Sequence, residues 1–142
     1  MNSAAKSLRV LLGVGALYHL LLGLAGLFMK DQAAELARLF FRFNLSPTPE
    51  ILWLLNPFSA YLLAFGLLMA VTALDPVKYR AFVYVVVTLY AVRVLERIWF
   101  LVAGEEALRV AGNPVQQAIH LGVVVIMAGA MLVLASRSRA AP

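Results

Sequence analysis

Cysteine is absent from the 142-residue chain. This absence excludes disulfide bonds, thiolate metal sites, iron–sulfur clusters and covalent c-type haem attachment. Charge is also scarce, since Asp, Glu, Lys and Arg make up 13% of the residues, whereas a soluble domain carries about 25%. With 63% hydrophobic residues and a mean hydropathy of +0.90, the composition predicts an integral membrane protein. The length predicts a single domain over residues 1–142.

The sequence also lacks the motifs of common hydrolases and nucleotide-binding proteins. No serine lies in a nucleophile motif, no aspartate lies inside a hydrophobic run, and no glycine-rich phosphate loop is present. We therefore expect a protein that is not an enzyme; the alternative is acid or base catalysis by Glu96 or a histidine on a lipid-soluble substrate. The net charge of +5 does not predict nucleic-acid binding, because most of the surplus flanks hydrophobic runs and sets their orientation.

Four hydrophobic runs are long enough to cross the roughly 30 Å hydrocarbon core of a bilayer. They cover about residues 10–28, 51–74, 81–103 and 115–135, and they predict an all-α integral membrane protein with a four-transmembrane-helix bundle. We interpret the first run as a retained helix and not as a signal peptide, because it is long and lacks an A-x-A cleavage site. Residues 31–44 predict a short amphipathic helix that either lies in the outer interface or folds back onto the bundle.

Basic residues gather on one side of the predicted spans. They are Lys6, Arg9, Lys78, Arg80, Arg137 and Arg139, with Asp75 as the acid on that side. By the positive-inside rule, this distribution predicts that both termini are cytoplasmic. Trp53 and Trp99 fall at the opposite, outer ends of their helices, where interfacial aromatic residues gather.

Prolines indicate where the helices begin. Asp75 and Asn113 each precede a proline, so that the first residue can cap a helix while the proline takes the first helical position. Asn56 also precedes a proline, Pro57, but inside the second run. Either that helix begins near Thr48 and kinks at Pro57, or a new helix begins at Pro57.

The third run carries three ionisable residues, Arg93, Glu96 and Arg97, within a helical arc of about 100°. Its thirteen Phe, Val, Leu and Ile residues favour insertion by roughly 4–8 kcal/mol, and the three charges oppose it by roughly 7–10 kcal/mol. This helix therefore needs protein neighbours, and charges inside a membrane predict a functional site. The structural alternative is an ion pair of Glu96 with one arginine while Arg97 snorkels to the outer interface.

Polar residues gather in the outer half of the predicted bundle. His19 and Arg93 fall at a depth of roughly 14–18 Å from the cytoplasmic ends, Arg97 and His120 at roughly 22–24 Å, and Asn56 at roughly 27 Å. The predicted ligand-binding residues are Arg93, Glu96, Arg97, His120, Asn56, Gln116 and His19, with Gln117 beside them. Two cations against one anion leave a positive surplus, which favours an electron-rich ligand.

His19 has further interpretations. It shares a helical face with three glycines, Gly15, Gly23 and Gly26. Small residues let helices approach closely, so His19 is expected to form a hydrogen bond across a tight helix pair. Alternatively, His19 and His120 ligate a b-type haem whose propionates lie near an arginine. A third interpretation is a metal site of His19, His120 and Glu96, which has suitable ligand types but no spacing motif.

Three stretches resemble the DoxX-like group of small bacterial membrane proteins. They are LRVLLGVGALYHLLLGLAGLF (8–28), AYLLAFGLLMAVTALDPVKYR (60–80) and VRVLERI (92–98). The resemblance implies a four-helix protein of the bacterial inner membrane that is associated with redox complexes, including quinone-linked ones. No functional residue is carried over by this resemblance, because none of the three stretches is a diagnostic motif.

The small size and the outer-half polar cluster predict an accessory subunit of a membrane complex or a protein that holds a lipophilic ligand, and the resemblance implies that the complex is a redox complex or the ligand a quinone. The expected partners are membrane lipids, other membrane subunits or further copies of the chain. The alternatives are a b-type haem electron carrier and a small oligomeric transporter. A transporter would need polar residues in the cytoplasmic half of the bundle, and the sequence has few there.

Overall fold

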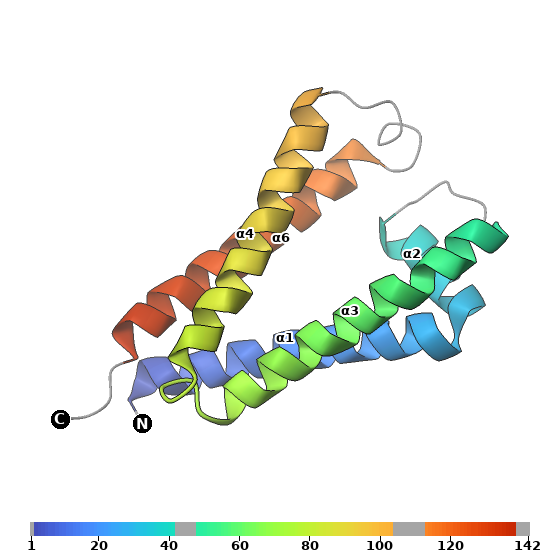
Figure 1. Ribbon diagram of the computed structural model, residues 1–142. Helices are drawn as coiled ribbons and strands as arrows, with labels where there is room; N and C mark the ends of the chain where they lie inside the picture. The colour runs from blue at the N-terminus through green and yellow to red at the C-terminus, as the bar shows by residue number, and fades with distance from the viewer. Residues whose placement is uncertain (1, 42–47, 104–112, 139–142) are drawn as a thin grey trace.

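The computed structural model describes residues 2–41, 48–103 and 113–138, and these ranges form five helices and no strand (Figure 1). The helices are α1 (Ser3–Phe28), α2 (Lys30–Phe41), α3 (Pro49–Leu74), α4 (Arg80–Ala103) and α6 (Pro114–Arg137). The predicted all-α class is therefore confirmed. Each long helix includes almost the whole of one predicted hydrophobic run.

Three of these helices, α1, α3 and α6, are long and apolar enough to cross a membrane, as expected of a membrane protein. The fourth long helix, α4, has 24 residues but is not apolar enough to qualify by the same standard. Its charged residues Arg93, Glu96 and Arg97 account for the difference. Length and composition thus establish three candidate spans, one fewer than the sequence predicts.

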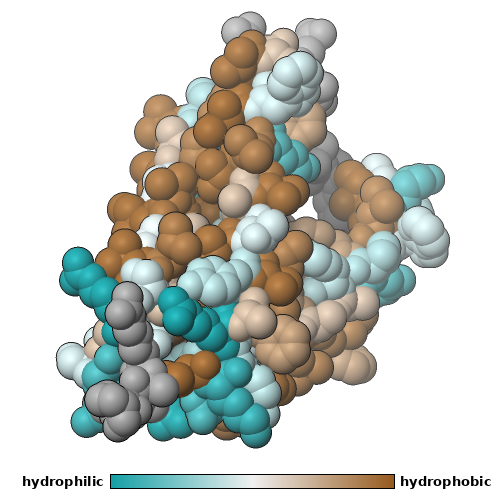
Figure 2. Space-filling model, turned by 60° about the vertical axis from the view of Figure 1, so that its left-hand side comes forward, coloured by the Kyte–Doolittle hydropathy of each residue, from teal (hydrophilic) through white to brown (hydrophobic). Residues whose placement is uncertain are grey.

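Hydrophobic side chains cover most of the face seen in Figure 2, and hydrophilic ones gather at its lower end. Large apolar residues are exposed along every long helix, among them Val10, Leu24, Leu67, Val102 and Ile126. An aqueous surface of this composition would be unusual, because large exposed apolar patches mark contacts with lipid or protein. The surface therefore agrees with a membrane environment.

The helix starts follow from local capping chemistry. The Thr48 hydroxyl accepts a hydrogen bond from the Ile51 amide at 3.4 Å, and α3 then runs without interruption through Pro57. Of the two alternatives for this span, the start near Thr48 is therefore correct. The side chain of Asn113 caps α6 as predicted, accepting from the Val115 amide at 2.9 Å.

Asp75 caps a turn and not the first turn of α4. Its carboxylate accepts from the amides of Val77 and Lys78 at 3.2 and 3.0 Å, and α4 begins only at Arg80. The predicted capping chemistry is present, but the helix begins one turn later than the Asp75-Pro76 pair predicts. Its start agrees with the hydrophobic run predicted over residues 81–103.

The long helices form two pairs, α1 with α3 and α4 with α6 (Figure 1). The pairs meet at the end of the molecule that holds both termini and diverge toward the other end. At the meeting end, the side-chain nitrogen of Asn2, Nδ2, donates to the Arg137 carbonyl oxygen at 3.1 Å. Arg9 donates to the carbonyl oxygens of Ala73, at 2.9 Å, and Leu74. These bonds satisfy carbonyl groups that a helix end leaves open.

The buried core lies near this meeting end. It includes Leu8, Leu12, Met69, Val86 and Met131, which come from all four long helices and are fully shielded from solvent. The residues of this core cluster are all hydrophobic. The polar groups of interest lie beyond it, where the pairs begin to separate.

Glycine sets the distance between α1 and α3. A Cβ atom on Gly23 would lie 2.7 Å from Leu63 Cγ and 3.0 Å from the Leu63 amide nitrogen, and one on Gly66 would lie 3.0 Å from the Leu20 amide nitrogen. The backbones thus approach too closely for any larger residue at these positions. The predicted close packing along the glycine face of α1 is confirmed. The predicted hydrogen bond of His19 across the helix pair is wrong, because the imidazole Nδ1 bonds to the Gly15 carbonyl oxygen of α1 itself.

The predicted amphipathic helix is α2, and its bounds differ slightly from the predicted range. It spans Lys30–Phe41, and residues 42–44 of the prediction lie outside the described residues. Leu36 and Leu39 are exposed, 40% and 71% respectively. The structure leaves both predicted orientations of α2 open, in the interface or against the bundle, because the rest of its predicted apolar face is outside the described side chains.

Candidate functional site

The two arginines of α4 turn inward and the glutamate turns outward. Arg93 and Arg97 are half-buried, whereas Glu96 is exposed. The cause is helical geometry, because Arg97 is rotated by about 40° from Arg93 in one direction and Glu96 by about 60° in the other. The three charges therefore do not share one interior stripe, although they lie in one arc.

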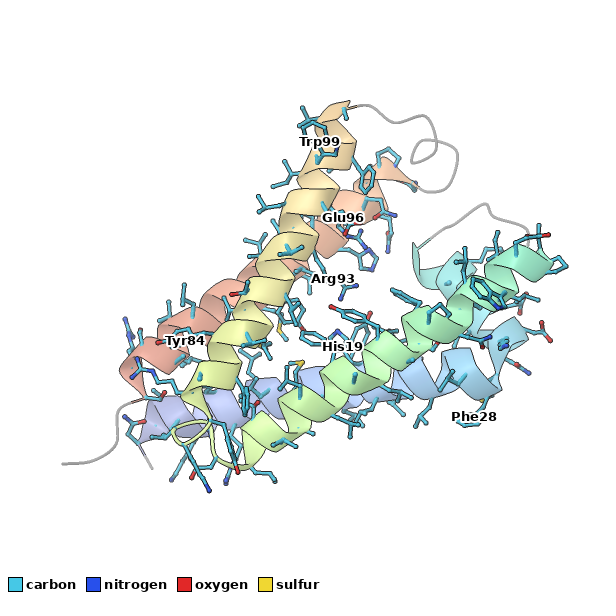
Figure 3. The ribbon with its side chains drawn as sticks, viewed as in Figure 1. His19, Phe28, Tyr84, Arg93, Glu96 and Trp99 are labelled. Atoms are coloured by element: carbon cyan, nitrogen blue, oxygen red, sulfur yellow. The ribbon has the colours of Figure 1, made fainter. Side chains whose placement is uncertain are left out.

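The ion pair expected between Glu96 and an arginine is not formed within the described part of the chain. The ion pair that does form in this part joins Arg38 and Glu35 on the surface of α2, with 3.3 Å between the guanidinium nitrogen and the carboxylate oxygen. Arg93 has no hydrogen bond to any other described residue. It lies within electrostatic range of His19 and Tyr90, and Figure 3 shows Arg93 and His19 on facing sides of the space between the helix pairs.

Arg97 reaches across to α6 and donates a hydrogen bond to the side-chain oxygen of Gln117. Gln117 is buried, with 5% of its surface exposed. Gln116, which the sequence analysis includes among the ligand-binding residues, is half-buried, and its carbonyl oxygen accepts from His120 Nδ1 at 2.8 Å. Both glutamines fit the helical spacing to His120, so only the packing of α6 could distinguish them.

His19 is enclosed where the two pairs begin to separate. It is 2% exposed, and its Nδ1 lies 2.7 Å from the carbonyl oxygen of Gly15, one turn earlier in α1. Its other ring nitrogen, Nε2, is buried and has no hydrogen-bond partner among the described residues. A buried polar atom without a hydrogen bond costs about 1–3 kcal/mol. A ligand that donates a hydrogen bond to Nε2 would remove this cost.

Three aromatic rings from three helices contact His19, and a fourth stacks on one of them; we call Tyr18, Tyr61, Phe65 and Tyr90 the aromatic cluster. Phe65 meets the imidazole edge-on at a centroid distance of 4.8 Å, and Tyr18 does so at 5.2 Å. Tyr90 lies 6.1 Å from His19 and 5.5 Å from Phe65. Tyr61 stacks on Phe65 at 6.1 Å. Sequence reasoning missed Tyr18, Tyr61 and Phe65, although the i, i+4 spacing of the last two was visible.

The cluster places polar groups opposite the arginines. Tyr18 lies within electrostatic range of Arg97. Tyr18 and Tyr61 both lie within electrostatic range of Tyr90. Tyr18 and Tyr61 are 50% and 41% exposed, whereas Tyr90 is buried. The site thus has one cationic side on α4 and one aromatic side on α1 and α3, with His19 at its base.

The remaining predicted residues are His120 and Asn56. His120 is half-buried on α6 and, like His19, bonds through Nδ1 to the carbonyl oxygen one turn before it. Asn56 is half-buried on α3, one turn before the buried Ser59. Within the described ranges, no three His, Asp or Glu side chains lie close enough to hold a metal ion. The metal site of His19, His120 and Glu96 is therefore not formed.

Fold and site together define a small all-helical membrane protein with a cationic and aromatic site between two helix pairs. No family model, curated protein or solved structure matches the chain.

Proposed function

We propose that the protein binds a lipophilic ligand with electron-rich oxygen atoms, such as a quinone, between the α1–α3 and α4–α6 pairs. It would do so as a small accessory subunit of a membrane redox complex. The observation that supports this proposal is the pair Arg93 and Arg97, which form no ion pair within 4.0 Å among the described residues, although Glu96 lies within electrostatic range of Arg97. Arginine recognises carbonyl and carboxylate oxygens well, because it presents several donors in a fixed plane.

The proposal includes α4 as a fourth span and both termini in the cytoplasm of a bacterial cell, at the inner membrane. α4 runs alongside α6, and its arginines are partly sheltered there, as an intramembrane charge requires. The end that holds Asn2 and Arg137 also carries Lys6, Arg9, Lys78 and Arg80, as the positive-inside rule expects of a cytoplasmic side. Membership of the DoxX-like group belongs to the same proposal. The proposal also includes contact with another subunit or with another copy of the chain, because Glu96 is exposed.

Removal of the cationic side tests this function. The double variant Arg93→Leu with Arg97→Leu is expected to insert and fold but to lose the ligand that co-purifies from native membranes, as measured by mass spectrometry of the extracted lipids. A matched control is Lys30→Leu with Arg38→Leu, which removes the same charge from α2. Equal ligand content in both double variants would show that the arginines do not hold it.

A second candidate, a b-type haem electron carrier, is favoured by one observation. Both histidines place Nδ1 against a carbonyl oxygen of their own helix, the arrangement that orients a histidine to ligate through Nε2. This function predicts a red preparation whose Soret band disappears in His19→Ala and in His120→Ala. A colourless protein from haem-supplied cells would exclude it.

A further inference from the structure

His19 is held in one tautomer by its own helix. A carbonyl oxygen only accepts hydrogen bonds, so the 2.7 Å contact with Gly15 places the hydrogen on Nδ1. In the neutral imidazole, Nε2 then carries a lone pair and acts only as an acceptor. Because Nε2 has no partner among the described residues, the base of the site offers an acceptor that lacks a donor.

The rings around His19 do not supply that donor. Phe65 has no polar atom, and the Tyr90 hydroxyl is directed to the Met69 sulfur atom, at 3.9 Å. Tyr18 meets the imidazole edge-on and forms no hydrogen bond with it. A bound molecule is thus a natural source of the missing hydrogen atom.

Arg93 restricts what this molecule can be. Its guanidinium group only donates hydrogen bonds, and Figure 3 shows Arg93, on α4, near His19, on α1, where the two helix pairs begin to separate. A carbonyl group bound between them would accept from Arg93 but would leave Nε2 without a partner. A hydroxyl group can accept from Arg93 and donate to Nε2 at the same time, which satisfies both sides.

We infer that the site prefers a ring ligand that carries a hydroxyl group, such as the reduced dihydroxy form of a quinone, over the oxidised dicarbonyl form. This inference rests on the proposed function and assigns a redox preference to the same site. Since Nε2 is covered in the structure, a side chain must move to admit the ligand. Of the three rings in contact with His19, Tyr18 is half-exposed while Phe65 and Tyr90 are buried, so rotation of Tyr18 opens the site.

The experiment measures the binding of both redox forms to the full-length protein in lipid nanodiscs. The probes are a decyl-substituted benzohydroquinone and the corresponding benzoquinone, titrated anaerobically by calorimetry. Because one additional hydrogen bond to a buried acceptor is formed, we expect the hydroquinone to bind about tenfold more tightly. In His19→Phe, which keeps a flat ring but removes the acceptor, the two dissociation constants should become equal. Tyr84→Phe, near the other end of α4, should leave the tenfold ratio unchanged.

A second measurement does not depend on a variant that folds. The chain has two histidines, so a 15N-histidine-labelled sample gives a simple nitrogen spectrum. The hydroquinone should shift the Nε2 signal of His19 in the direction of a hydrogen-bonded acceptor, and the benzoquinone should not. Equal affinity for the two forms, or an unchanged Nε2 signal with bound hydroquinone, would overturn this inference but not the proposed function. Failure of both forms to bind would overturn the two together.

Discussion

At the scale of single residues, the approach of α1 to α3 depends on Gly23. A Cβ atom there would meet Leu63 at 2.7 Å from Cγ and 3.0 Å from the amide nitrogen. Backbone atoms cannot move aside as a flexible side chain can. We therefore expect Gly23→Ala to destabilise the fold by about 1–3 kcal/mol, measured by circular dichroism during unfolding in mixed micelles.

Gly129 on α6 provides the matched control. A Cβ atom there would meet no described atom within 4 Å, so Gly129→Ala adds only helix propensity and should stabilise the protein by about 0.5–1 kcal/mol. If both variants lost the same stability, the close contact between α1 and α3 would not be the cause.

At the scale of the element, α4 combines a membrane-spanning length with two inward-facing arginines. Its insertion as an isolated segment is expected to be incomplete, because the charges offset the apolar residues. Replacement of Arg93 and Arg97 by leucine should make the insertion of residues 80–103 more favourable by about 5–8 kcal/mol. A glycosylation-based insertion assay of the segment measures this change.

The same assay needs a control that leaves the charges in place. Val92→Leu with Val94→Leu exchanges one apolar residue for another, and it should shift the insertion free energy by less than about 1 kcal/mol. Complete insertion of the unmodified segment would show that α4 needs no shelter from α6.

At the scale of the whole molecule, the proposed topology places the start of α3 and the end of α6 on opposite sides of the membrane. The cysteine-free chain makes this directly measurable, because each added cysteine is the only reactive thiol. Glu50→Cys should react with a membrane-impermeant maleimide from outside the inner membrane. Arg137→Cys should react only after permeabilisation. The reverse pattern would invert the topology.

Much of the helical framework could be predicted from the sequence, because it depends on neighbouring residues. The fourth run, predicted over residues 115–135, became α6 (Pro114–Arg137), with Asn113 as its cap. Asp75 shows where such reasoning ends. Its carboxylate caps a turn as expected, but whether that turn continues into α4 depends on how the connection packs.

The candidate site was predicted only in part. The helical rise placed Arg93 and His19 near the same depth and Arg97 one turn further out, and the structure brings Arg93 within electrostatic range of His19. The sequence could not show that Glu96 faces outward or that Arg97 bonds to Gln117 and not to Gln116. Such choices depend on the rotation of α4 and α6 about their axes, which distant parts of the chain determine.

The sequence by itself determined the membrane class, the helical elements and most of their ends, because hydropathy and capping act over a few residues. Only the tertiary structure decided that the helix pairs diverge and that His19 is buried among Tyr18, Phe65 and Tyr90. The unpartnered Nε2 of His19 is the clearest example. Its burial and lack of a donor arise from three helices that meet in space, and no local pattern encodes them.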